Sequence, residues 1–256
     1  MNTRNLLVLI FAVTLSGCGN GSNYPVEKRF WTPEDYDAVI RHIRFVTPQG
    51  EEFPRFSNPE TSIVIQKLVD QQNFEVILDD TELGLNHRNE VSQAFFDRYQ
   101  DMERGYAVMD VQDKYVYAQE LIEIHKFGLA VQLKYFKLGN DRILEESDSP
   151  DAARTKEIIA SNEQALIKNY IIYLEHVSDE KRYGSHAPSL AEGLTKYFFK
   201  LLETYPKANY DAMLNKANLV AKKIQTPELK SALSSLITKL ETLKQSKLDQ
   251  APTGSL

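Results

Sequence analysis

Residues 117–138 read YAQELIEIHKFGLAVQLKYFKL, and this stretch decides the fold class. Apolar or small side chains recur along it at alternating intervals of four and three residues, the period of one face of an α-helix. This first stripe consists of Tyr117, Leu121, Ile124, Gly128, Val131, Tyr135 and Leu138. A second stripe consists of Ala118, Ile122, His125, Leu129 and Phe136. Two apolar faces predict a central helix within residues 111–146 that packs against neighbours on both sides, with Gly128 allowing a close approach.

Prolines and capping residues indicate where other helices begin. A side-chain oxygen that precedes proline can cap the free backbone N–H groups of a helix, and proline is well tolerated at the first helical position. Four pairs have this pattern: Thr32-Pro33, Asn58-Pro59, Ser149-Pro150 and Thr226-Pro227. Asp110 and Ser189 begin further patterns of the capping-box type. We therefore expect helix N-termini at these six places.

These signals together predict one all-α, bundle-like domain of about seven or eight helices over residues 30–247. The expected helices include 33–46, 86–103, 111–146, 150–178, 189–205, 208–224 and 227–247. The segment 59–78 leaves an alternative open, because its apolar runs 63–65 and 74–78 would also suit a short strand pair. Residues 248–256 are polar and contain Pro252 and Gly254, which predicts a disordered tail.

Composition excludes several classes of protein. The chain has 256 residues, of which 42% are hydrophobic and 26% charged, so it is neither collagenous nor wholly disordered. Its formal net charge of −6 argues against binding to nucleic acid. The single cysteine, Cys18, excludes an internal disulfide and a cysteine-rich metal site. No cofactor is expected.

The N-terminus has the pattern of a secretory signal. Arg4 precedes an apolar run, LLVLIFAVTL, from Leu6 to Leu15. A membrane-spanning helix needs about 20 apolar residues, so this run is too short to span a bilayer. Its length suits the apolar core of a signal peptide.

Leu15-Ser16-Gly17-Cys18 follows this run and resembles the lipobox of bacterial lipoproteins. The resemblance covers roughly the first 18 residues. It implies a cleaved signal peptide at 1–17, a diacylglyceryl group on Cys18 and a lipidated flexible tether at 18–29. Gly19 stands where an aspartate favours retention in the inner membrane of enterobacteria, so the periplasmic face of the outer membrane is expected. An ordinary signal peptide with an unmodified cysteine remains the alternative.

Two groups of residues are candidates for chemistry. Glu120, Glu123 and His125 lie close in sequence, but on one helix Glu120 and Glu123 point about 140° and 160° away from His125, so a metal site would need ligands from other helices. The alternative is a core histidine hydrogen-bonded to a neighbouring helix. Ser185 and His186 could form a nucleophile and base, or could lie in a turn before the Ser189 cap.

Three functions follow from these features. The first is a membrane-anchored envelope lipoprotein whose helical domain binds a partner, which could be a protein. The second is a carrier of an apolar ligand between helices rich in aromatic residues, such as Phe96, Tyr99 and Phe198. The third is a metal-assisted enzyme. The lipobox and the lack of a catalytic motif favour the first, non-enzymatic function.

Overall fold

The computed structural model of the protein describes residues 24–46, 52–112 and 114–250. Three of the predicted features fall wholly or partly outside these ranges. They are the signal peptide at 1–17, residues 18–23 of the tether with Cys18, and residues 251–256 of the tail.

Helices account for all the regular secondary structure of the described residues, and no strand occurs among them. The elements in chain order are α1 (Pro33–Val46), α2 (Ser62–Leu68), α3 (Gln72–Leu78), α4 (Leu85–Gln112), α5 (Ala118–Glu146), α6 (Ala153–Ser178), α7 (Glu180–Tyr183), the 3₁₀ helix η2 (Gly184–His186), α8 (Ala187–Thr204), α9 (Asp211–Ala221) and α10 (Pro227–Gln250). In the described part of the chain, seven of the helices have eleven residues or more. The all-α prediction is therefore confirmed.

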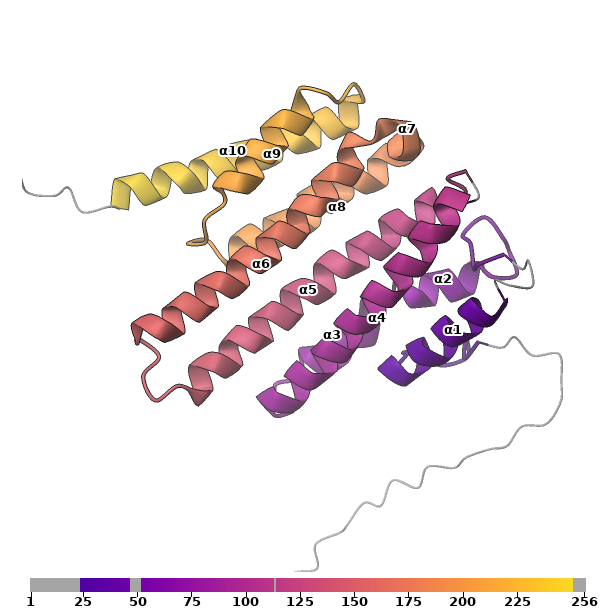
Figure 1. Ribbon diagram of the computed structural model, residues 1–256, viewed down its shortest axis with the longest axis horizontal. Coiled ribbons are helices and arrows are strands. Elements are labelled where there is room, and N and C mark those ends of the chain that lie inside the picture. The colour runs from indigo at the N-terminus through magenta and orange to yellow at the C-terminus, as the bar shows by residue number, and fades with distance from the viewer. Residues whose placement is uncertain (1–23, 47–51, 113, 251–256) are drawn as a thin grey trace, which may run out of the picture.

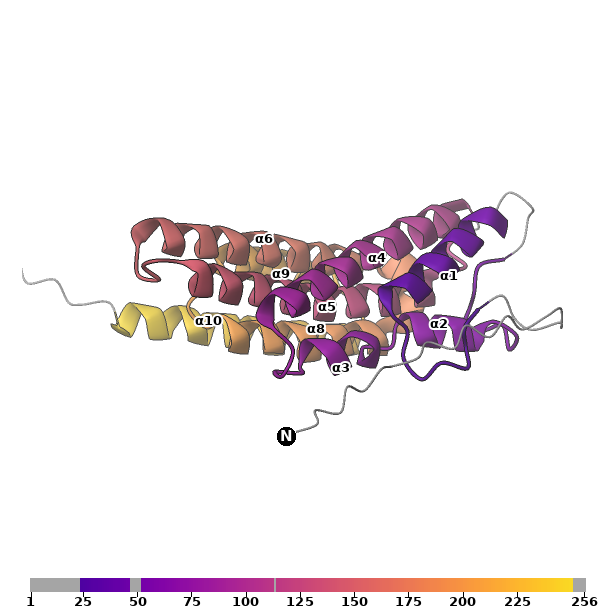
Figure 2. The same cartoon turned by 90° about the horizontal axis from the view of Figure 1, so that it is seen from below.

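Helix α5 lies at the centre of the bundle. Figure 1 shows α4 and α6 on either side of it, with α1 and α2 beyond α4 and with α9 and α10 at the opposite edge, and Figure 2 shows α3 beneath α4. Figure 2 shows α8 and α10 below the layer that contains α4 and α6. Helix α5 packs directly on α4, α6 and α8, so it meets neighbours on more than one side, as its two apolar stripes predict.

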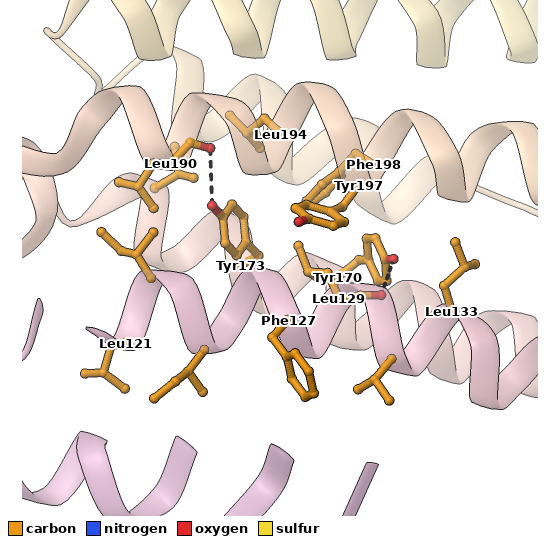
Figure 3. Close-up of a cluster of buried hydrophobic side chains, with 14 of the residues drawn as sticks. Leu121, Phe127, Leu129, Leu133, Tyr170, Tyr173, Leu190, Leu194, Tyr197 and Phe198 are labelled. Atoms are coloured by element: carbon orange, nitrogen blue, oxygen red, sulfur yellow. Dashed lines mark hydrogen bonds between the residues drawn. The ribbon is translucent and has the colours of Figure 1, made fainter. Parts of the chain in front are cut away.

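The core between α5, α6 and α8 is built from leucines and aromatic rings (Figure 3). Two buried tyrosines from α6 cross this core and use their hydroxyl groups to join the neighbouring helices. Tyr170 donates to the carbonyl of Leu129 on α5 at 2.6 Å, and Tyr173 donates to the carbonyl of Leu190 on α8 at 3.3 Å. Because each hydroxyl has a partner, the large apolar surface of these rings is buried without an unsatisfied polar group.

Gly128 permits the close packing of α4 on α5. A Cβ atom at Gly128 would collide with the ring of Tyr99 on α4. Gly193 on α8 has the same relation to Tyr173 on α6. The prediction that Gly128 allows a close helix approach is confirmed, since the partner occupies the volume that any larger side chain would fill.

The predicted helix starts are correct in some places and wrong in others. Helices α1 and α10 begin at Pro33 and Pro227, as expected. After Asn58-Pro59 the chain first forms a turn, in which the Asn58 side chain accepts the Glu60 N–H at 3.0 Å, and α2 begins only at Ser62. Helix α6 likewise begins at Ala153, a few residues after Ser149-Pro150.

Asp110 does not start a helix, contrary to expectation. It lies within α4, which runs on to Gln112, and α5 begins later, at Ala118. The fully buried Asp110 carboxylate accepts the Tyr117 N–H at 2.6 Å and pairs with Arg182 of α7, also at 2.6 Å. The prediction fails because of tertiary contacts: the Asp110 carboxylate binds the backbone at Tyr117, just before α5, and Arg182 of α7, and it does not cap a helix that begins at Asp110 itself.

The segment 59–78 forms the two short helices α2 and α3, so the alternative of a strand pair is wrong. Burial explains this result. Val64, Ile65 and Leu68 are buried on α2, and Phe74 and Leu78 on α3, at spacings that place them on one helical face. Across the described residues, no helix combines the length and the apolar character that crossing a bilayer requires.

Candidate functional site

A half-open cleft of about 220 Å³ lies over α5, between α4 and α6. Helices α4 and α6 both pack on α5, which forms the floor of the cleft. Aromatic side chains on its walls are Phe96 and Tyr99 from α4 and Tyr173 from α6. Its polar lining includes Glu103 from α4, His125 and Gln132 from α5, and Asn169 and His176 from α6. Three helices that are distant in sequence therefore supply one site.

His125 and His176 stack against each other inside this cleft. Their ring centroids are 3.9 Å apart and their planes differ by 12°. Burial lowers the pKa of His176 to about 2, with smaller contributions from His125 and Arg182, so His176 is uncharged at neutral pH. His176 therefore adds no positive charge to the cleft.

Glu103 lies next to the histidine pair and carries a negative charge. Its Oε1 lies 3.5 Å from Nε2 of His125, and the His125 hydrogen bond holds the pKa of the Glu103 carboxyl below its ordinary value. No lysine or arginine forms an ion pair with Glu103 in the described part of the chain. The nearby Arg104 and Arg182 pair instead with Asp101 and Asp110.

Two buried acceptor atoms on the α5 residues of the cleft lack a hydrogen-bond partner among the described residues. They are Nδ1 of His125 and Oε1 of Gln132, on side chains that are 5% and 3% exposed respectively. When Nε2–H of His125 points to Glu103, Nδ1 is an acceptor, as is Oε1 of Gln132. Leaving such an atom unsatisfied costs about 1–3 kcal/mol, and natural interiors rarely contain one without a reason. Both residues line the cleft, and the convergence of charged, amide and imidazole groups from three helices marks it as the candidate site.

The three residues considered for a metal site are not brought together. Glu120 is buried and accepts the backbone N–H of Phe56 at 2.8 Å, and burial raises the pKa of its carboxyl. Glu123 faces Lys126 and Ser189, whereas His125 faces Glu103 and His176. No cluster of three or more metal-ligating side chains of the His, Cys, Asp or Glu type is found in residues 24–46, 52–112 and 114–250.

Ser185 and His186 lie in the short helix η2, away from the cleft. Ser185 is exposed, and within the described residues no hydrogen bond joins it to His186. His186 is close enough to Glu120 to favour its charged form. Helix α8 begins at Ala187, so the expected cap at Ser189 is wrong.

Ser189 instead belongs to a partly buried polar cluster between α5 and α8, in which only Lys126 is buried. Its hydroxyl donates to Oε1 of Glu123 at 2.5 Å and accepts from Nζ of Lys126 at 3.1 Å, and Nζ also lies 2.6 Å from Glu192. Burial by itself would lower the pKa of Lys126, but Glu192 and Glu123 together raise it. Because Lys126 keeps its proton, it cannot activate Ser189 as a base, and the cluster serves to join two helices.

The sequence contains no local signal for Glu103, Gln132, Asn169 or His176 as site residues. They come from three helices, and the only histidine among the sequence candidates that lines the cleft is His125. Of the aromatic residues considered for an apolar carrier, Phe96 and Tyr99 line the cleft, whereas Phe198 is packed in the core. Packing between helices, not spacing along one helix, assembles this site.

Comparison with known proteins gives no match. No family model matches the chain, and neither a curated protein nor a solved structure shows significant similarity to it.

Proposed function

We propose that this chain is a lipid-anchored protein of the bacterial envelope whose helical domain binds a ligand in the cleft between α4 and α6. The anchor is supported by Leu15-Ser16-Gly17-Cys18 after the short apolar run. The binding function is carried by one observation, the charged Glu103 carboxylate, which lines the cleft without a lysine or arginine ion-pair partner among the described residues. A ligand with donor groups would pair with it.

The chemistry of the lining suits binding better than bond breaking. The cleft presents one carboxylate, a histidine that is uncharged at neutral pH, amide groups and aromatic rings. Ser189, whose hydroxyl contacts Glu123 and Lys126, lies outside this cleft, in the cluster where Lys126 remains protonated. A few convergent polar groups on apolar walls are typical of ligand sites.

A lipid on Cys18 would keep the domain close to a membrane, because the tether is short. Five residues separate Cys18 from Tyr24, where the described chain begins, and a fully extended chain between these two residues would span at most ~20 Å. A lipid on Cys18 would therefore hold the domain within that distance of the bilayer surface. Gly19 favours the outer membrane, with the cleft available to ligands in the periplasm.

Substitution of the lipidation site tests the anchor. In a Gram-negative host, the wild-type chain should incorporate labelled fatty acid and sediment with the outer membrane. Cys18→Ser should remove the label and release the protein from the membrane fraction, since two or more acyl chains are required for stable attachment. Ser22→Ala, in the same tether, is the matched control and should behave as the wild type. Equal labelling and sedimentation of Cys18→Ser would contradict the anchor.

A further inference from the structure

Four large apolar side chains are exposed together where α4 ends and α5 begins. Val108 and Val111 lie three residues apart on one face of the last turns of α4, and Tyr115 and Val116 follow just before α5. They are between 40% and 62% exposed, and we call these four residues the apolar tip. Figure 1 shows this part of the chain at the end of the bundle where α7 also lies. Exposed apolar side chains that gather in one place mark a surface for contact with a protein or a membrane.

The backbone at the apolar tip is strained and held in place. Lys114 and Tyr115 have φ angles of 58° and 71°, in the left-handed region that residues other than glycine rarely adopt. The Tyr115 N–H donates to the carbonyl of Asp110 at 2.6 Å, and the Asp110 carboxylate accepts the Tyr117 N–H. The guanidinium of Arg182 lies over the Tyr115 ring, 5.2 Å from its centroid. These contacts fix a conformation in which the apolar side chains remain exposed.

The tether enters the fold close to the apolar tip. Tyr24 packs edge-on against His42 of α1, with ring centroids 5.1 Å apart. Burial raises the pKa of Tyr106 on α4 above its ordinary value, and Tyr24 lies near enough to raise it further. Tyr106 precedes Val111 by five residues, or about 7.5 Å along the helix. Because the tether extends at most ~20 Å from Tyr24, Cys18 can reach the level of the apolar tip.

The side chains of the apolar tip suit the surface of a phospholipid bilayer. Valine side chains gain free energy when they leave water. Tyrosine is enriched where a membrane meets water, because its ring is apolar and its hydroxyl stays hydrated. Lys114 is exposed between Val111 and Tyr115, and its flexible stem allows the ammonium to reach a lipid phosphate. Lys181 of α7 is exposed as well.

On the basis of the proposed lipid anchor, we propose that the apolar tip docks on the phospholipid bilayer to which Cys18 is attached. The anchor keeps the apolar tip at a high local concentration near the surface, so a contact that is weak by itself becomes effective. A tether alone leaves the domain free to rotate above the membrane. The apolar tip supplies a second contact and fixes the orientation of the bundle.

Fluorescence of a labelled cysteine tests this docking in the full, lipidated chain. Lipidation uses the thiol of Cys18, so a cysteine introduced elsewhere is the only free thiol. Val111→Cys reports on the apolar tip. Ile158→Cys is the matched control, because it also replaces an exposed aliphatic residue on a helix. Ile158 lies near the start of α6, at the opposite end of α5 from Val111.

Both proteins carry the fluorophore NBD and are reconstituted in vesicles of phosphatidylethanolamine and phosphatidylglycerol, with or without a nitroxide on the acyl chains. We expect the nitroxide to quench NBD on Val111→Cys at least about twofold more than on Ile158→Cys, since only the apolar tip enters the bilayer. Adding Lys114→Glu to Val111→Cys should about halve the quenching, because it places a negative charge beside anionic lipid. Adding Lys156→Glu, on exposed α6 surface, should leave the quenching unchanged.

The other outcomes separate the docking from the anchor. Equal quenching of Val111→Cys and Ile158→Cys would overturn docking by the apolar tip. A blue shift on Val111→Cys that rises with the protein-to-lipid ratio and resists the nitroxide would overturn the bilayer in favour of a second copy of the chain. Labelling of the wild type would reveal a free Cys18 thiol and contradict the anchor together with the docking. An unlabelled wild type with unquenched Val111→Cys would contradict the docking alone.

Discussion

Helix α5 carries buried polar side chains on two flanks, and the two flanks satisfy them differently. Towards α8, Lys126 contacts Glu123, Glu192 and Ser189 at 2.6–3.1 Å. Towards α4 and α6, His125 and Gln132 each retain a buried atom without a partner among the described residues. We call the first the closed flank, because protein groups satisfy its polar side chains, and the second the open flank, because it borders the cleft. Burial of a polar residue on α5 therefore does not by itself indicate function.

The largest expected effect concerns the closed flank. Lys126→Met removes the cation that Glu123 and Glu192 share, and the Lys126 side chain is only 7% exposed. Loss of one partner from a buried ion pair costs about 3–5 kcal/mol, but both carboxylates reach solvent, so we expect a loss of about 2 kcal/mol in the free energy of unfolding. Urea denaturation measures this loss.

Lys137→Met is the matched control for this measurement. Lys137 lies on the same helix and pairs with Asp141, but its side chain is 52% exposed. Its substitution should change the free energy of unfolding by less than about 0.5 kcal/mol. If Lys126→Met had no greater effect than this control, the closed flank would not stabilise the bundle as we describe.

The next effect concerns the pH dependence of the open flank. In the folded protein, burial lowers the pKa of His176 from the ordinary 6.5 to about 2, so this side chain is neutral. In the unfolded chain, His176 binds a proton as the pH falls below 6.5, whereas in the folded protein it does not. The free energy of unfolding therefore decreases as the pH falls through 6.5. Between pH 7 and pH 5.5 we expect a decrease of about 1 kcal/mol from this residue.

His176→Phe should remove this part of the pH dependence, because it replaces the imidazole with a ring that does not titrate. His87→Gln, at an exposed position on α4, should retain it. Urea denaturation of the three proteins at both pH values makes the comparison. The same pH dependence in the wild type and in His176→Phe would show that His176 is not held neutral by burial.

The smallest effect has the opposite sign. Gln132→Leu replaces a buried amide, whose carbonyl lacks a partner, with an apolar side chain of similar size. Such a replacement avoids the cost of desolvating an unsatisfied acceptor but also loses the hydrogen bond between Gln132 and Tyr99, so we expect a net gain of no more than about 0.5 kcal/mol in the free energy of unfolding without ligand. Thermal and urea denaturation measure this gain. A loss instead would mean that Gln132 stabilises the fold and is not kept for binding.

Helix positions were largely predictable because they depend on local properties. The alternating apolar spacing around Leu121 and Gly128 places α5 at the centre of the bundle, and Thr32-Pro33 and Thr226-Pro227 mark the starts of α1 and α10 correctly. The errors at Asp110 and Ser189 share one cause. Both residues have the pattern of a cap, but each uses its side chain to bind another helix. A polar side chain near a helix end bonds wherever the tertiary fold offers the better partner.

The sequence by itself determined that the chain is helical, that α5 has two buried faces and that Cys18 stands where a lipoprotein would carry its lipid. These features follow from backbone periodicity and from a linear motif, which need no tertiary contact. Only the tertiary structure decided that His125 meets His176 and Glu103, and that Gln132 lies in the same cleft. The rotation and packing of α4 and α6 on α5 set these contacts, and pairings between helices leave no spacing signal within any one of them.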